Sequence, residues 1–385
     1  MLAPLAGLFL VQSSPPPKNG EDSAARTVAL SSGTQALSPD GKELAFDAEF
    51  HGLHRFPDRV SIRFLSVRSG EVRLSVPCPD TRIEDLAWSP DGTTVAYVSH
   101  DGAVEVLRSK DGSVEARFAT SPDAARPTGE RRSIQFVDGG SKLLLAGGAA
   151  PVQLRRHEDG TLVVDFLLDA GACASATCVS SDAFHFAVGD VQGCYAVYSA
   201  RTGAREAGPF HGPEPVNALA FSPDGTRLAA GLGDCRVRVL SLRSSAGVAE
   251  YSHCDQDLLA SLQIGSVAFR PDGRALLASS FSFYEVRLWD LETGSVLSHF
   301  DYSGGNEGAI TARFAADPAT VVLSTGDVLD AADGHVVRSL SPTRFGETFG
   351  SCGSCAWTTS KGSLRVFDVR DGSLVSDLEL REPVR

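Results

Sequence analysis

The chain has 385 residues, of which 42% are hydrophobic and 22% are charged, and its formal net charge is −13. This composition is that of a folded globular protein and excludes long-range disorder. The acidic balance argues against nucleic acid and anionic membranes as partners, because both need clustered Lys and Arg side chains to offset phosphate charge.

An apolar run at residues 2–11 precedes the triple proline of residues 15–17. The run has the length of a signal-peptide core and is too short to span a bilayer. No Lys or Arg comes before it, and no A-x-A cleavage site follows it. We therefore predict a flexible Pro-rich tail over residues 1–25 and a cytoplasmic protein. The alternative is a degenerate export signal at residues 2–11.

The motif Ser-Pro-Asp-Gly recurs between short apolar runs, at residues 38–41, 89–92 and 222–225, with Arg-Pro-Asp-Gly at 270–273. Proline presets the corner of a turn, glycine permits a positive φ angle, and aspartate caps the backbone between them. Repeats of about 40–45 residues built from short strands and glycine turns indicate a β-propeller, whose blades are four-stranded sheets. We predict an all-β fold with a single propeller over residues 26–385 and four antiparallel strands per blade.

A second glycine turn comes before the fourth strand of each repeat and gives the count of blades. It recurs at Gly70, Gly112, Gly160, Gly203, Gly247, Gly294, Gly334 and Gly372. These positions predict eight blades, with seven as the alternative. The weakest units are the third, where residues 137–140 replace the first turn, and the eighth, whose first strand before Cys352 is barely recognisable.

The sixth unit resembles a WD repeat over residues 267–273 and 286–294, including the pair Trp289-Asp290. Phe367-Asp368 echoes that pair in the last unit. The resemblance covers nearly all of residues 27–380, and it implies that loops after the second and fourth strands share one partner-binding face. The family's Gly-His is absent before the first strands.

His211 is the nearest substitute for the family's histidine, and Asp234 stands where its structural aspartate would lie. We therefore expect the family's hydrogen-bonded tetrad to be incomplete and the packing of the blades to supply rigidity. Residues 37–46 are also similar to the repeats of TolB-like propellers and of propellers that precede prolyl-peptidase domains. The G-x-S-x-G elbow of such peptidases does not occur in the sequence. An exported TolB-like envelope protein is kept as an alternative.

The search for reactive motifs yields no catalytic, cofactor-binding or metal-ligating set. The sequence has no glycine-rich phosphate loop. His51, His54 and His100 follow second strands and so share a face, but no carboxylate pattern completes a site. The eight cysteines are too sparse for a disulfide scaffold and are interpreted as buried thiols; the C-x-x-C pair Cys352 and Cys355 has no second half for a zinc site. We predict that the protein is not an enzyme and needs no cofactor.

The candidate partner-binding residues lie in loops, where binding residues concentrate on rigid scaffolds. They are aromatic, His and Arg side chains, which are typical interface anchors: Phe50, His51, His54, Arg55 and Phe56 in the first unit, Phe281, Phe283 and Tyr284 in the sixth, and Arg344 and Phe345 before the eighth. The alternative is that these rings fold inward as a plug over the central channel or between blades.

These observations predict a monomeric, non-catalytic scaffold whose loops bind a protein or a peptide. The competing hypothesis is an enzyme or a small-ligand-binding propeller that uses the central channel. That hypothesis requires polar side chains that converge on the channel and have perturbed pKa values.

Overall fold

The computed structural model describes residues 28–51, 57–67, 69, 71–78, 82–120, 132–147, 151–166, 173–243, 248–253, 263–280, 285–301, 311–315, 317–340, 348–352, 355–360, 363–368 and 374–379. The predicted tail, residues 1–25, lies outside them. In the described ranges every regular element is a β-strand except one short 3-10 helix. This confirms the predicted all-β class.

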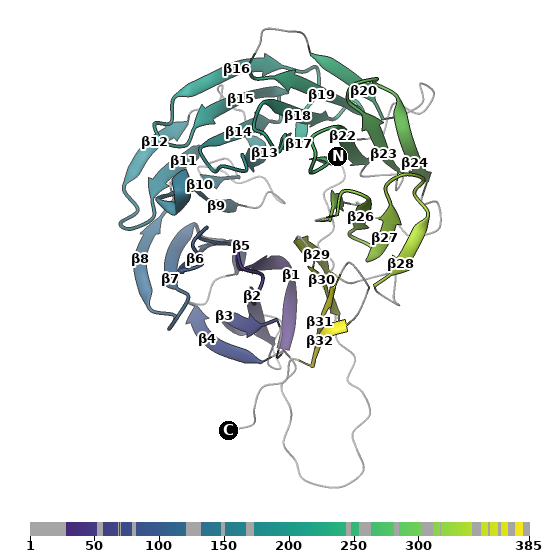
Figure 1. Ribbon diagram of the computed structural model, residues 1–385. Coiled ribbons are helices and arrows are strands. Elements are labelled where there is room, and N and C mark those ends of the chain that lie inside the picture. The colour runs from purple at the N-terminus through teal and green to yellow at the C-terminus, as the bar shows by residue number, and fades with distance from the viewer. Residues whose placement is uncertain are drawn as a thin grey trace.

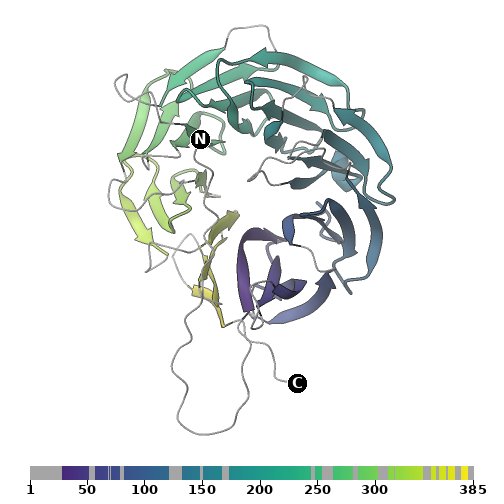
Figure 2. The same cartoon turned by 180° about the vertical axis from the view of Figure 1, so that it is seen from behind.

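The described strands form eight four-stranded antiparallel sheets, which follow one another around a ring (Figures 1 and 2). Each sheet contains four consecutive strands, so no described blade combines strands from opposite ends of the chain. The fold is therefore a β-propeller with eight blades, as predicted, and not the seven-bladed alternative.

The strands of the first four blades have these bounds. Blade 1 contains β1 Val28–Leu37, β2 Glu43–His51, β3 Pro57–Ser66 and β4 Val72–Cys78; blade 2 contains β5 Ile83–Trp88, β6 Thr94–Ser99, β7 Ala103–Arg108 and β8 Val114–Ala119. Blade 3 contains β9 Ser133–Val137, η1 Asp138–Gly140, β10 Lys142–Ala146, β11 Val152–Arg156 and β12 Leu162–Phe166; blade 4 contains β13 Ala174–Val179, β14 His185–Asp190, β15 Cys194–Ser199 and β16 Arg205–His211.

The other four blades follow the same order. Blade 5 contains β17 Val216–Phe221, β18 Arg227–Leu232, β19 Arg236–Ser241 and β20 Ala249–Ser252; blade 6 contains β21 Ile264–Phe269, β22 Ala275–Ser280, β23 Glu285–Asp290 and β24 Val296–Asp301. Blade 7 contains β25 Ala312–Phe314, β26 Thr320–Leu323, β27 Asp327–Asp330 and β28 Val336–Ser339; blade 8 contains β29 Thr348–Cys352, β30 Cys355–Ser360, β31 Ser363–Asp368 and β32 Leu374–Glu379. Both weak units of the sequence are thus complete blades.

The Ser-Pro-Asp-Gly corners are closed by a side-chain network that begins at the serine. At residues 222–225 the Ser222 hydroxyl donates to Asp224 Oδ1 at 2.6 Å and accepts the Arg227 backbone N–H at 2.9 Å. Asp224 also accepts the Thr226 backbone N–H at 3.0 Å. The corners at Ser38 and Ser89 repeat this pattern, and so does the Ser-Ser-Asp-Ala corner at residues 180–183. Sequence reasoning assigned roles to the proline, aspartate and glycine but missed the serine, which ties the turn to the second strand.

The hydrogen bond from Ser222, with that from the Thr226 backbone, lowers the pKa of Asp224 to about 2. We expect Ser222→Ala to raise this pKa toward 3.8 and to destabilise the fold by about 1–2 kcal/mol, because Ser222 is fully buried and makes two of the bonds. The Asp224 carboxylate contributes stability above pH 3.8, and that contribution is lost as the pH falls through about 2. Urea unfolding and carboxyl NMR titration check both effects; an unchanged Asp224 pKa would contradict them.

The blades are joined by apolar seams. Seven clusters of buried side chains in the described part of the chain each combine residues from two consecutive blades, from the seam of blades 1 and 2 to that of blades 7 and 8. Strand β6 shows how this arises, because Val95 and Tyr97 face blade 1 whereas Ala96 and Val98 face blade 3. Each of blades 2 to 7 therefore buries both faces of its sheet.

The glycine turns before the fourth strands complete the seams at the rim. Gly160 has φ +70°, and a Cβ atom there would clash with the ring of Phe118 in the preceding blade. Gly203 lies in the same way against Val164, and Gly334 against Phe300. Glycine is required at these turns both for the left-handed backbone and for the close approach of the next sheet.

Gly160→Ala should therefore destabilise the protein more than Gly294→Ala does. Gly294 has nearly the same backbone, φ +73°, but no atom within 4 Å of the added Cβ. We expect about 1–2 kcal/mol for the backbone alone at Gly294 and roughly 1–3 kcal/mol more at Gly160 from overpacking. Denaturant unfolding of both variants measures the difference. Equal losses would mean that the seam does not select glycine.

Candidate partner-binding face

Connections from second to third strands and from fourth to first strands end on one side of an antiparallel propeller, which we call the loop face. The three predicted segments all include a connection of this class: residues 50–56 contain the connection 52–56 from β2 to β3, residues 281–284 join β22 to β23, and residues 344–345 lie between β28 and β29. His54, Arg55, Phe56, Phe281, Phe283, Tyr284, Arg344 and Phe345 lie outside the described residues. Their roles stay predictions.

Phe50 and His51 do not belong to a loop, which corrects the prediction. Both are in β2, where the backbone of Phe50 pairs with Arg59 and that of His51 with Pro57. Strands β2 and β3 have 9 and 10 residues, whereas second and third strands elsewhere have at most 6. The sequence of residues 50–56 is compatible with an inserted loop or with a longer hairpin. The backbone pairing of β2 with β3 up to His51 and Pro57 shows that the hairpin is longer. It extends blade 1 at the loop face by about 10 Å.

The innermost strands of neighbouring blades are linked by side chains that a bulge redirects. The register of β5 slips between Ile83 and Asp85, and Asp85 Oδ2 accepts the Ile134 N–H of the next blade at 2.9 Å. A slip at the same place in β13 lets Ser175 donate to the Val216 carbonyl at 2.6 Å. Bulges re-aim side chains in this way. These bonds fix the ends of the seams at the loop face.

Glu84, at the bulge of β5, is the centre of an ionic cluster between blades 2 and 3. Its Oε2 accepts the Arg132 backbone N–H at 3.0 Å, and Oε1 lies 2.7 Å from Nδ1 of His100. The Arg132 guanidinium is 3.9 Å from Glu84 and donates to the His100 carbonyl. Glu84 and Arg132 are 5% and 6% exposed, whereas the His100 ring reaches solvent. The sequence analysis grouped His51, His54 and His100 on one face. Of these three, only His100 belongs to the ionic cluster, where it pairs with the Glu84 carboxylate.

Glu84→Ala should destabilise the protein by about 3 kcal/mol, because it removes the carboxylate that faces a buried guanidinium. Glu115→Ala is the matched control, since Glu115 pairs with Arg108 at 2.8 Å on the surface. An exposed pair of that kind contributes at most about 1 kcal/mol. Equal unfolding free energies for the two variants would refute the bridging role of Glu84.

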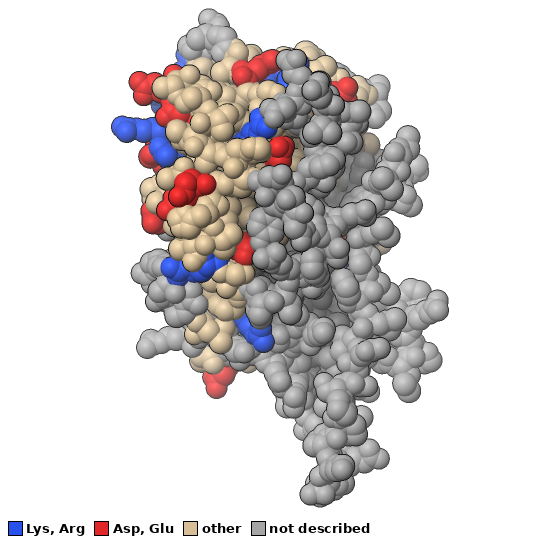
Figure 3. Space-filling model, turned by 90° about the vertical axis from the view of Figure 1, so that its right-hand side faces the viewer, with Lys and Arg blue, Asp and Glu red and all other residues tan. Residues whose placement is uncertain are grey.

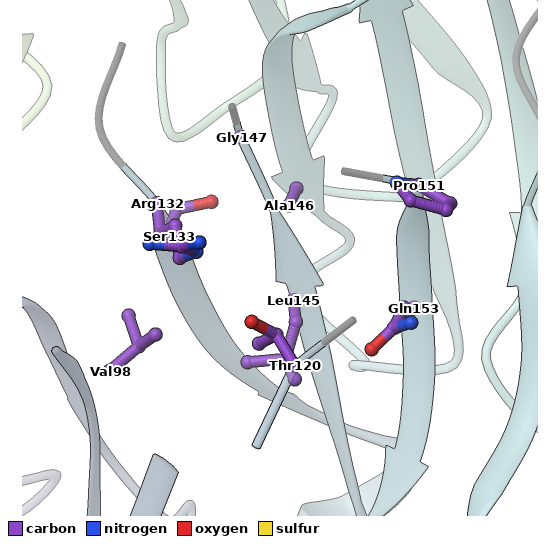
Figure 4. Close-up of a pocket in the computed structure, with 9 residues that line it drawn as sticks. All are labelled: Val98, Thr120, Arg132, Ser133, Leu145, Ala146, Gly147, Pro151 and Gln153. Atoms are coloured by element: carbon purple, nitrogen blue, oxygen red, sulfur yellow. The ribbon is translucent and has the colours of Figure 1, made fainter. Parts of the chain in front are cut away.

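A shallow hollow, open to solvent, lies at the loop face beside this cluster. Figure 4 shows Arg132 and Ser133 on one side, Pro151 and Gln153 on the other, and Leu145 and Ala146 between them. Val98, Thr120 and Gly147 complete the lining. The lining residues come from the ends of β6, β8 and β10 and the starts of β9 and β11. Their distance in sequence explains why no local motif revealed the hollow.

The connection between blades 5 and 6 contains a further residue that the sequence reading missed. His253, which follows β20, is fully buried and packs on Trp289 of the Trp-Asp pair with ring centroids 5.8 Å apart. Its Nε2 donates to the Glu285 carbonyl at 3.3 Å, and burial lowers the pKa of His253 to about 3, so the ring is neutral. Its separation from β21 by an insertion hides it from motif matching.

The predicted pair His211 and Asp234 does not behave as the family's histidine and aspartate do. Asp234 accepts the Arg236 backbone N–H at 3.2 Å, and the His211 carbonyl accepts from Arg238 at 2.9 Å. Each residue is thus engaged in other contacts. Of the family's tetrad, the described residues show the contact of a histidine with the tryptophan, which His253 makes on Trp289.

Three observations concern metal-ligating and thiol groups. In the described ranges no cluster of three or more His, Cys, Asp or Glu residues could hold a metal ion. Cys178, on the inner strand β13, has its pKa raised to about 12 by burial and stays a thiol at neutral pH. Cys352 and Cys355 pair across the hairpin of β29 and β30, at the face opposite the loop face.

One cysteine departs from the interpretation as a buried thiol. Cys235 is disulfide-bonded, whereas Cys78 and Cys178 are thiols. Cys235 lies between β18 and β19, and its carbonyl accepts the His253 N–H at 2.9 Å. The disulfide therefore belongs to the loop face of blade 5.

Charged side chains are dispersed on the described part of the rim. Over β20, β24 and β28, Figure 3 shows basic and acidic side chains separated by uncharged surface. Arg238 pairs with Glu250 at 2.8 Å, and His299 with Glu285 at 2.9 Å. No helix among the described residues is long and apolar enough to span a membrane.

Comparison with known proteins agrees with this architecture. Residues 206–241, from β16 to β19, match the family profile described as WD domain, G-beta repeat. The periodic tryptophan protein 2 homolog of Schizosaccharomyces pombe is 28% identical over 139 residues, which are 34% of this chain and 15% of that protein. Periodic tryptophan protein 2 of Arabidopsis thaliana is 28% identical over 135 residues, 34% of this chain and 14% of that protein. The matches thus span about one seventh of these relatives.

Two solved structures share the fold. The β-propeller domain of Cps50 (Swd1) from Myceliophteria thermophila has a TM-score of 0.54 and 15% identity, with 78% of this chain and 94% of that chain covered. The computationally designed Ika8 protein has a TM-score of 0.59 and 18% identity, with 78% and 87% covered. The chain is a β-propeller that carries a WD repeat.

Proposed function

We propose that the protein is a non-catalytic scaffold whose loop face binds a protein or peptide. The observation that carries the proposal is topological, because three segments rich in aromatic and Arg residues all join strands that end on this face. Rigid strands that present such side chains make an interface without a large ordering cost. Our proposal keeps the propeller as one domain over residues 26–385.

The described ends of these segments support that role. The hairpin of β2 and β3 extends blade 1 beyond its neighbours. At blade 6, Glu285 directly follows residues 281–284 and is held by His299 through its side chain and by His253 through its carbonyl. Both segments therefore start from fixed strands.

The channel enzyme is the less well supported alternative. Asp85 and Glu84, the carboxylates of inner strand β5, accept backbone N–H groups of blade 3 and so serve the seam. The raised pKa of Cys178 disfavours a thiolate nucleophile. We propose a monomer with no nucleic-acid partner, in keeping with the net charge of −13 and the dispersed charges of Figure 3.

Replacing Phe281, Phe283 and Tyr284 with Ala should weaken partner capture and leave the melting temperature within a few degrees. The matched control replaces Val296, Leu297 and Val336 with Ala, because these exposed aliphatic residues lie on the rim. A thermal unfolding curve first gives the melting temperature of each variant. Affinity capture by the folded variants, with quantitative mass spectrometry, then compares their partner binding. Equal capture, or a collapse of stability that assigns the rings to the core, would contradict the proposal.

The disulfide at Cys235 favours the exported alternative over a cytoplasmic location. Disulfides persist mainly in oxidising compartments, and the run at residues 2–11 has the length of a signal core. We therefore propose that the scaffold works outside the reducing cytosol.

Of the eight cysteines, two should then be oxidised in protein isolated from its native source, which leaves six titratable thiols after unfolding without reductant. Thiol titration with mass analysis of the mature amino terminus checks this. Eight thiols and an intact residue 1 would restore the cytoplasmic prediction.

A further inference from the structure

We propose that Cys235 forms its disulfide with Cys254, and that this bond positions His253 against the start of β23, where the aromatic segment of residues 281–284 ends. The inference deepens the proposed function and rests on it in one respect, the role of the aromatic segment in binding. The pairing of the two cysteines rests on geometry and on the order of residues in the chain.

Cys235 occupies a turn position that glycine fills in three other blades. The turns from second to third strands contain Gly102, Gly193 and Gly326, with φ between +86° and +88°. Cys235 has φ +66°, in the left-handed region that residues other than glycine rarely adopt. Each of the four carbonyls accepts the N–H of the first residue after the fourth strand, at 2.8–2.9 Å. The four positions are therefore equivalent, and blade 5 has a cysteine where the backbone favours glycine.

The equivalent glycines show where the Cys235 side chain points. A Cβ atom added at Gly102 or Gly193 would clash with the first residue after the fourth strand of the same blade. In blade 5 that residue is His253, whose N–H donates to the Cys235 carbonyl at 2.9 Å. The sulfur of Cys235 is therefore directed at the chain that leaves β20.

This direction selects Cys254 as the partner. Cys254 follows His253 directly in the sequence, and consecutive Cα atoms are about 3.8 Å apart. The next cysteines along the chain in either direction are Cys194 in blade 4 and Cys352 in blade 8. Cys254 lies outside the described residues, and its pairing is inferred from the contacts of Cys235 and His253.

His253 links the disulfide to blade 6. Its side chain is fully buried, packs on Trp289 and donates from Nε2 to the Glu285 carbonyl at 3.3 Å. Glu285 is the first residue of β23 and directly follows the aromatic segment. The Cys235 carbonyl holds the N–H of His253, and a disulfide at the next residue restrains its other side. His253 is thus a positioning residue for the end of the aromatic segment, and the disulfide acts through it.

The bond forms by thiol–disulfide exchange with the disulfide of an oxidised carrier. One cysteine thiolate attacks a carrier sulfur and gives a mixed disulfide, from which the second cysteine displaces the carrier's thiolate. The two cysteines together lose two electrons and two protons, and the carrier disulfide becomes a dithiol. An excess of a reduced dithiol reverses the exchange.

Peptide mapping of protein from its native source tests the pairing. Thiols are alkylated first, and the protein is then digested with trypsin without reductant. Trypsin cleaves after Lys and Arg except before proline, so Cys235 lies in peptide 228–236 and Cys254 in peptide 244–274, each with a single cysteine. We expect the two peptides to be linked and to separate on reduction. An alkylated Cys235, or its linkage to any other peptide, overturns the pairing.

A double variant tests the positioning of His253. Cys235→Gly with Cys254→Ser removes the bond and restores the residue that the equivalent turns use, so the protein should keep a cooperative thermal transition. Burial lowers the pKa of His253 to about 3, and release of the ring should raise that pKa toward 6.5 in an NMR titration. A pKa that stays near 3 in the double variant refutes the positioning role.

The matched control is Cys352→Ser with Cys355→Ser, which also removes two cysteines but at the opposite face of blade 8. It should leave the pKa of His253 unchanged. Partner capture should fall severalfold in the Cys235 and Cys254 variant, because a less restrained segment costs more to order on binding. Capture by the control should equal that of the unmodified chain, and equal capture by both variants contradicts the proposal.

Failure of this inference is distinguishable from failure of the proposed function. If peptides 228–236 and 244–274 are linked and the double variant raises the pKa of His253, but the Phe281, Phe283 and Tyr284 variant captures partners normally, the disulfide inference stands and the aromatic segment is not the interface. If that triple variant loses capture while the double variant keeps it, the scaffold proposal stands and the disulfide does not position the segment.

Discussion

Burial of both faces of the sheets, seen in blades 2 to 7, is the constraint on which the structure depends. The strand alternation that exposes one face in an ordinary antiparallel sheet here sends successive side chains into two different seams, as Tyr97 and Val98 of β6 show. No blade can bury its apolar residues alone. The turns must accordingly let neighbouring sheets approach closely, which is why glycine faces Phe118, Val164 and Phe300 at three of the seams. Stability and geometry are therefore properties of pairs of blades.

The same constraint leaves the loop face as the place where function can vary. Seams use the strand faces, and bulged first strands use Asp85 and Ser175 for bonds to the next blade. These two polar residues of inner strands are thus committed to the scaffold. Residues at the loop-face ends of the strands are less constrained by packing between blades. The lengthened hairpin of blade 1, the aromatic segments and the hollow beside Arg132 all occur there. The net charge of −13 argues against anionic partners at this face.

The sequence revealed the features that repeat. The corners at residues 38–41, 89–92 and 222–225 and the glycines before fourth strands predicted the fold and all eight blades, because identical local geometry demands identical residues. Unique features were not predictable. Glu84 and Arg132 are 48 residues apart, and only the assembled seam brings them together. An insertion hides His253 from its repeat, and whether residues 50–51 extend a strand depends on pairing with residues 57–59.

Hydrogen–deuterium exchange of the protein with and without its captured partner tests the central claim most directly. The account predicts that the partner slows exchange at the loop face, in peptides that span residues 48–60, 98–103, 279–286 and 340–349. The Ser-Pro-Asp-Gly corners and the fourth strands of the rim should exchange as in the free protein. Protection confined to those corners or to the rim would contradict the assignment of function to the loop face.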